Sequence, residues 1–214
     1  MLCLGALLFS IAGFSQHSMV IDRIAVVVGK EVIKTSDIDR DLRVTQFLNR
    51  ERLDFSVEAK RKAAERLIDQ AVIRREIMSG GYRRANDSDA DALLRQIRQS
   101  RFGGSESRMK EALSRYQLTE ETLRERLLWQ LTVLRFIDQR FRPGVLVTDE
   151  DVRSYYDQHL AELKRQYPRD SSFAALEPKI RELLTGERIN QSFVQWLEGA
   201  RSRVQIKYHQ GAFQ

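Results

Sequence analysis

The chain has 214 residues, of which 31% are charged and 42% hydrophobic, with three prolines and one cysteine. This balance is typical of a folded, mostly helical protein and excludes a disordered chain. The net charge of +6 comes from 36 basic and 30 acidic residues, an intermixed pattern that specifies no anionic partner.

The chain opens with an uncharged apolar segment, Met1 to Ser15, which ends in small residues that include Ala12 and Gly13. The segment is too short to span a bilayer and predicts a signal peptide over residues 1–15, cleaved near Ser15. No Lys or Arg precedes the segment, although signal peptides usually begin with a positively charged region. The alternative to a signal peptide is a buried N-terminal helix. After cleavage, residues 16–214 would work outside the cytoplasm. They contain no cysteine, since Cys3 is removed, which excludes disulfides, thiol catalysis and cysteine-ligated metals.

Strand patterns lie at both ends of the remaining chain. Two β-branched runs, Ile24 to Val28 and Val32 to Lys34, flank a glycine-containing turn and predict a hairpin. Near the C-terminus, Val204, Ile206 and Tyr208 alternate with polar residues. Two strands alone are marginal, so we expect this third strand to join the hairpin and tie the chain ends together.

The pattern between the strands is helical. Helices are predicted over 37–50, 57–79, 88–100, 105–116, 119–141 and 149–164, and a last one from Pro178 to Arg203. Three starts carry a capping-box signal: Ser36 with Asp39, Ser88 with Asp91, and Thr148 with Asp151. The last helix carries one apolar stripe, formed by Ile189, Phe193, Trp196, Leu197 and Ala200. The predicted fold is mostly α, with a small β-sheet formed by the N-terminal hairpin and the C-terminal strand.

The predicted helix over 119–141 is apolar on two faces. One stripe consists of Leu123, Leu127, Leu131 and Leu134, and the second of Trp129, Val133, Phe136 and Ile137. A helix with two apolar faces either lies centrally in the core or lines a groove that receives another molecule. The sequence leaves both alternatives open.

Four segments match a known family in their motifs. They are Val20-Ile-Asp-Arg-Ile-Ala-Val-Val-Val-Gly-Lys-Glu-Val-Ile-Lys-Thr-Ser-Asp-Ile, Leu67-Ile-Asp-Gln-Ala-Val-Ile-Arg-Arg-Glu, Val147-Thr-Asp-Glu-Asp-Val-Arg-Ser-Tyr-Tyr, and the close from Arg188 to Tyr208. This pattern resembles the chaperone module of the SurA family over nearly all of residues 16–214. Members share the strand pair, the Leu-Ile-Asp helix, the Tyr-Tyr helix, and the final helix and strand.

The resemblance implies a periplasmic holdase that binds unfolded outer-membrane proteins or peptides. By this resemblance, residues 16–214 form one SurA-like domain with two parts. The first part, residues 20–165, contains the N-terminal hairpin and the helices that follow it, and the second, residues 173–209, contains the C-terminal helix and strand. It also suggests the outer-membrane assembly machinery as a partner. Family members normally carry parvulin-type prolyl isomerase domains between the Tyr-Tyr helix and the final helix, where this chain has only Leu163 to Ser172. We therefore expect chaperone activity without isomerase activity.

The chemistry-bearing residues favour a protein that is not an enzyme. The three histidines, His17, His159 and His209, form no pair with metal-ligand spacing, and each is interpreted as a solvated surface residue. Asp149, Glu150 and Asp151 stand at a predicted helix start, where capping and the helix dipole explain them without catalysis. We expect no catalytic residue, no metal and no cofactor.

A holdase needs accessible apolar surface of adaptable shape, which aromatic and methionine side chains supply. We hypothesise a client-binding groove lined by Met78, Phe102, Met109, Tyr116, Trp129, Phe136 and Tyr155. Each of these residues also fits a role in the core.

Two other classes of function remain as alternatives. A nucleic-acid binder is suggested by the basic run from Arg95 to Phe102, together with Arg108 and Lys110. The predicted secretion signal and the scattered acidic residues argue against it, and we expect no nucleic-acid partner. The other alternative is a non-catalytic structural adaptor in an envelope complex, which would bind a folded partner in place of unfolded clients.

Overall fold

The computed structural model describes residues 22–213, so the predicted signal peptide, with Cys3 and His17, lies outside the described residues. The elements in chain order are β1 (Ile24–Val28), β2 (Glu31–Lys34), α1 (Thr35–Asn49), α2 (Val57–Ser79), α3 (Asp87–Phe102), α4 (Glu106–Arg115), α5 (Glu120–Phe141), the 3-10 turn η1 (Arg142–Gly144), α6 (Asp149–Gln166), α7 (Phe173–Ser202) and β3 (Ile206–Tyr208). The predicted fold class, mostly α with a small sheet, is confirmed. No helix among residues 22–213 is long and apolar enough to cross a membrane.

The sheet joins the two ends of the described chain. Its order is β2-β1-β3, and β1 pairs antiparallel with both neighbours, including Val28 with Glu31 and Val28 with Ile206. Gly29 turns the hairpin at a φ of +60°, a conformation that glycine adopts without steric cost, and its N–H donates to Gln205 O at 2.8 Å. The predicted hairpin and its pairing with the C-terminal strand are confirmed, although Val204 lies before β3.

The start of α1 differs from the prediction, because Lys34 is the N-cap residue and its N–H donates to Asp37 Oδ2 at 3.0 Å, while a residue before the sheet binds the first turn. Asp22 accepts hydrogen bonds from the Ser36 hydroxyl at 2.6 Å and from the Ser36 N–H at 3.1 Å. The hydroxyl bond is the main cause that lowers the pKa of Asp22. The helix begins at Thr35, so Ser36 lies inside it and is not the cap. Asp22 fixes the helix start against β1 from outside the helix.

The second predicted capping box is also wrong, while the third is confirmed. Asn86 caps α3, and its N–H donates to Asp89 Oδ2 at 3.2 Å, two residues before the predicted pair of Ser88 and Asp91. The Asp91 carboxylate instead accepts from Arg124 Nε of α5 at 2.6 Å. At α6, Thr148 and Asp151 form the predicted reciprocal bonds.

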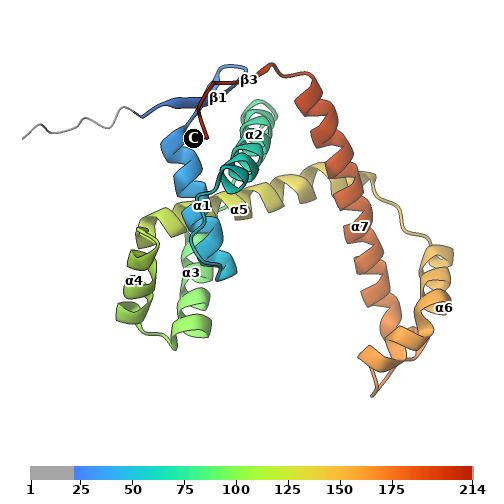
Figure 1. Cartoon of the computed structure of the whole chain (residues 1–214). Helices are drawn as coiled ribbons and strands as arrows, with labels where there is room; N and C mark the ends of the chain where they lie inside the picture. The colour runs from blue at the N-terminus through green and yellow to red at the C-terminus, as the bar shows by residue number, and fades with distance from the viewer. Residues whose placement is uncertain (1–21, 214) are drawn as a thin grey trace, which may run out of the picture.

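Helix α5 runs through the middle of the molecule (Figure 1). Its two apolar faces contact different clusters. Leu123 and Leu127 pack with α1, α3 and α4, whereas Phe136, with Trp129 beside it, packs with the C-terminal half of α2 and with α7. Leu134 departs from the predicted stripe, since 62% of its surface is exposed. Of the two alternatives for this helix, the central position holds for most of its length.

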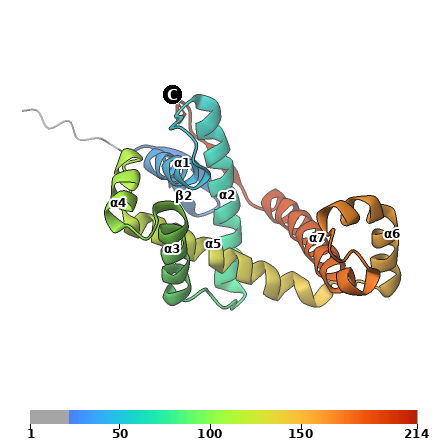
Figure 2. The same ribbon diagram turned by 90° about the horizontal axis from the view of Figure 1, so that it is seen from below.

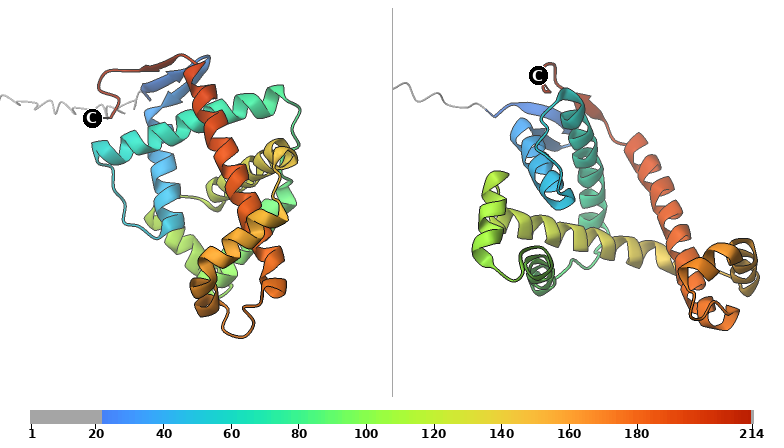
Figure 3. Two further views of the ribbon diagram at one scale, coloured as in Figure 1. Left: turned by 90° about the vertical axis from the view of Figure 1, so that its right-hand side faces the viewer. Right: turned by 60° about the horizontal axis from the view of Figure 1, so that its bottom comes forward.

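Helix α6 and the N-terminal half of α7 form an arm that projects from the rest of the molecule (Figure 2). The C-terminal half of α7 crosses close to α2. Its N-terminal half extends away from α2 and pairs with α6 (Figure 3). The arm has a small core of its own, formed by Val152, Leu163, Leu176 and Ile180.

The last helix begins earlier than predicted. Ser172 caps α7, because its hydroxyl accepts from Ala175 N at 3.4 Å, and the helix runs for 30 residues. Pro178 therefore lies in the second turn and not at the start. Because proline has no N–H, the helix forgoes one backbone hydrogen bond there.

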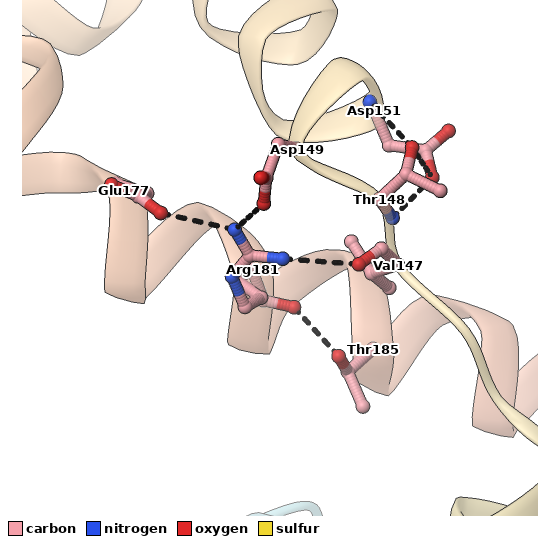
Figure 4. A network of polar contacts seen from close by, with 7 residues as sticks. All are labelled: Val147, Thr148, Asp149, Asp151, Glu177, Arg181 and Thr185. Carbon is pink, nitrogen blue, oxygen red and sulfur yellow. Dashed lines mark hydrogen bonds and ion pairs between the residues drawn. The ribbon is translucent and has the colours of Figure 1, made fainter.

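Arg181 fastens α7 to the start of α6 (Figure 4). Its guanidinium donates to Val147 O at 3.0 Å, to Asp149 Oδ1 at 2.6 Å and to Glu177 Oε1 at 3.0 Å. Two turns further along α7, Arg188 Nη2 pairs with Asp151 Oδ1 at 2.8 Å. These contacts hold the connection before α6 against the middle of α7.

Candidate functional site

The seven residues of the hypothesised groove do not gather on one surface. Met109 and Phe136 are fully buried, each with 0% of its surface exposed, so neither lines an open groove in this structure. Phe102 and Tyr116 pack beside Met109 against Phe47, with ring centroids 6.5 and 5.5 Å from that of Phe47.

Tyr155 lies in the arm, far along the chain from the other six. It stacks on His159 with ring centroids 4.1 Å apart, and His159 Nδ1 lies 2.9 Å from Tyr155 O. His159 is therefore half-buried and not simply solvated, which corrects the interpretation from sequence. Among the seven groove residues, Met78 and Trp129 line neighbouring cavities, and these cavities form the candidate site.

The larger cavity lies between the turn of the hairpin, the C-terminal half of α2 and the residue before β3. We name it the hairpin cavity, and its volume is about 750 Å³. Its apolar lining comes from three segments and consists of Val28, Ala71, Val72, Met78 and Val204. Met78 stands at the rim with 66% of its surface exposed, a large fraction for a long apolar side chain.

The smaller cavity lies between β2, α1, α2 and α5. We name it the Trp129 cavity, and its volume is about 340 Å³. Val32, Ile33, Leu67 and Trp129 supply apolar surface, while the other lining residues are mostly charged. Both cavities fall in the size range of sites that receive ligand side chains or small molecules.

Arg74 and Glu31 separate the two cavities. Both residues line both cavities, and their side chains form an ion pair between α2 and β2. The Arg74 guanidinium also lies over the Trp129 ring, 5.0 Å from its centroid. The ion pair is half exposed, with 45% of the Arg74 side chain accessible, so it can rearrange when a ligand displaces solvent.

A buried carboxylate supports the Trp129 cavity from beneath. Asp41 of α1 is 4% exposed and accepts from Arg66 Nη2 at 2.6 Å and from Arg126 Nη1 at 2.7 Å. Arg66 belongs to α2 and Arg126 to α5, so one side chain connects three helices around the cavity. This rigid frame keeps the lining residues in place.

The sequence prediction included Met78 and Trp129, which line the two cavities, but it did not include the charged lining residues or the hairpin side of the cavity. Arg74 and Arg75 precede Met78 by four and three residues on α2, so all three share one side of the helix. That spacing is visible in the sequence. The approach of Val28, Gly29 and Val204 to this side depends on the sheet and is not.

The described residues contain no group of three or more His, Cys, Asp or Glu side chains placed to hold a metal ion. The basic run proposed for nucleic acid is partly used inside the fold. Arg98 pairs with Glu120 at 2.8 Å, and Arg101 donates to Phe47 O at 3.5 Å. These contacts reduce the number of cations on the run that are free to meet phosphates.

No family model matches the chain, and no curated protein is significantly similar to it. The assignment of function therefore depends on the cavities and on the motifs of the sequence.

Proposed function

We propose that this protein is a periplasmic holdase, which binds unfolded outer-membrane proteins at the hairpin cavity and the Trp129 cavity and has no prolyl isomerase activity. The observation that carries the proposal is the pair of adjoining open cavities with Met78 exposed at the rim. An exposed apolar rim beside a cavity marks a binding surface, because a ligand that covers the rim removes apolar area from water.

The chemistry of the two cavities supports an extended client of varied sequence. Met78 is flexible and polarisable, and Trp129 offers a broad aromatic face, so both can contact side chains of different shapes. The Arg74–Glu31 pair supplies a donor and an acceptor for the polar groups of a client backbone. A site of this kind holds a chain without requiring one exact sequence.

The resemblance of the sequence motifs to the SurA family supports the same proposal. The connection between α6 and α7 spans only residues 167–172, which is too short for an inserted isomerase domain. Loss of isomerase activity is thus part of the proposal.

The test is light scattering of a denatured porin diluted into buffer with the purified chain. We expect suppression of aggregation at a near-stoichiometric ratio. Met78→Gln replaces an exposed apolar side chain with a polar one of similar length. It should raise the concentration needed for half-maximal suppression roughly fivefold to tenfold, since partial burial of a methionine is worth about 1–1.5 kcal/mol.

Leu134→Gln is the matched control, because Leu134 is 62% exposed on α5 and lines neither cavity. It should leave the suppression unchanged. Equal suppression by Met78→Gln and the unaltered chain would show that clients do not bind at these cavities. No suppression by the unaltered chain would overturn the holdase function in favour of an adaptor that binds a folded partner.

A further inference from the structure

The hairpin cavity combines apolar walls with two cations that have no carboxylate partner within residues 22–213. Its charged lining residues are Lys30, Glu31, Arg74 and Arg75, which leaves an excess of two positive charges. Glu31 is already paired with Arg74. Among residues 22–213, neither Lys30 nor Arg75 makes an ion pair or a side-chain hydrogen bond, so both charges are available at the cavity.

The two free cations lie at the same part of the rim. Arg75 reaches the hairpin turn from α2, since its Nη1 would lie only 4.0 Å from a Cβ atom built on Gly29. Lys30 follows Gly29 directly in the turn. Both residues are exposed, so neither charge is needed to hold the fold together. Two like charges at one rim repel each other, and a bound carboxylate would relieve that repulsion.

Apolar lining and cations are contributed by the same helix face. Met78 stands three residues after Arg75, so a client side chain packed against Met78 would place its chain neighbours near the Arg75 guanidinium. The apolar floor beneath consists of Val28, Ala71, Val72 and Val204. The cavity therefore fits an apolar side chain that has an acidic residue next to it.

We infer that the hairpin cavity selects segments of unfolded polypeptide in which a large apolar residue is flanked by Asp or Glu. The inference rests on the proposed function, which it deepens by naming the class of client segment. Lys30 and Arg75 are the residues that set this preference, and Met78 supplies the apolar contact. Clients with basic flanks are disfavoured at this cavity by the same charges.

Fluorescence anisotropy with the full chain tests the inference. Three labelled peptides share one leucine- and phenylalanine-containing core and carry flanks of Glu, Gln or Lys. At low salt the Glu peptide should bind roughly threefold to tenfold more tightly than the Gln peptide, as expected for two exposed charge pairs. The Lys peptide should bind most weakly. The difference should vanish near 1 M salt, where the screening length is about 3 Å.

The variant Lys30→Gln with Arg75→Gln should bind the Glu and Gln peptides equally. Arg108→Gln with Lys110→Gln, which makes the same charge change on exposed positions of α4, is the matched control and should keep the preference. The inference is overturned if the unaltered chain binds the Glu and Gln peptides equally, or if the control loses the preference to the same extent.

The Gln peptide separates this failure from failure of the proposed function. If the Gln peptide binds as tightly as the Glu peptide and Met78→Gln weakens both, the cavity receives clients without selecting for charge. If none of the three peptides binds, the proposed client site fails, and the selectivity fails with it.

Discussion

Asp41 is the residue on which three helices around the Trp129 cavity converge. Its side chain is buried and forms ion pairs with two arginines. The Arg126 side chain is 15% exposed and the Arg66 side chain 37%. Desolvating a carboxylate in this position costs free energy, so the ion pairs add little net stability. The structural role of Asp41 is to hold its two arginine partners in fixed positions. The charge also fixes where Arg126 stands at the cavity wall.

Replacing Asp41 with alanine should lower the free energy of unfolding by about 3 kcal/mol, because the variant leaves a mostly buried arginine without its carboxylate. Urea denaturation followed by circular dichroism measures the change. Asp39→Ala is the control, since Asp39 lies two residues away and makes no ion pair or side-chain hydrogen bond within residues 22–213. The control should change stability by less than about 0.5 kcal/mol. A similar loss in both variants would contradict a special role for Asp41.

Caps show at the residue scale what the sequence can and cannot specify. Thr148 and Asp151 were predicted correctly because both partners of the capping box lie within four residues. Ser36 was assigned wrongly because its partner, Asp22, lies 14 residues earlier and meets it only after the hairpin forms. At α3, Asn86 and Asp89 have the same spacing as Ser88 and Asp91, so the sequence is compatible with either pair as the capping box.

Among the elements, α6 depends on its first turn. Asp151 accepts from the Thr148 N–H at 2.8 Å and pairs with Arg188 of α7. The backbone hydrogen bond from Thr148 is the largest cause that lowers the pKa of Asp151 to about 2, from an ordinary value of 3.8. A carboxylate whose pKa is depressed on folding stabilises the folded state above its unfolded pKa, and this stabilisation is lost as the pH falls through the folded value.

The stabilisation from Asp151 is therefore present above about pH 4 and is lost between about pH 4 and pH 2. Asp151→Asn should lower the thermal unfolding midpoint at neutral pH and flatten the decline over this acid interval. Circular dichroism melts at a series of pH values check both effects. Glu150→Gln is the control, since Glu150 is exposed and has no partner among the described residues. An unchanged acid profile in Asp151→Asn would refute the assignment.

The element boundaries followed from the sequence wherever periodicity and local caps agreed, as for α2, which has the predicted limits. Helix α7 shows the weakness of a single-residue rule, because proline favours a first turn but is tolerated one turn later. The candidate site was harder to predict. Met78 and Trp129 were selected for their chemistry, but Met109 and Phe136 have the same chemistry and are fully buried. Only the packing of helices distinguishes the two pairs.

The whole molecule divides its apolar core unequally. The cluster under the sheet has thirteen buried residues, whereas the cluster between α6 and the N-terminal half of α7 has four. Burial of apolar surface is the dominant stabilising term, so the smaller cluster gives the arm less resistance to local opening. The exposed position of the arm in Figure 2 agrees with this difference.

Hydrogen exchange should show the amides of α6 opening at a lower free energy than those of α1 and α2. Ile180→Ala, which removes a side chain that is 2% exposed in the arm cluster, should accelerate exchange in α6 further and leave the amides of α2 unchanged. The matched change in the larger cluster, Ile68→Ala, should instead affect α1 and α2. Uniform exchange across arm and body would contradict the division.

The antiparallel pairing of β1 with β3 also constrains the order of events during synthesis. About 180 residues separate Val28 from its partner Ile206, so this contact is among the most non-local in the chain. Until β3 has been made, one edge of β1 has no strand beside it, and its backbone donors and acceptors are open to pairing with other chains. Contacts between distant residues also form slowly. The nascent protein must therefore keep its own central strand from misassociating until residues 206–208 have been made.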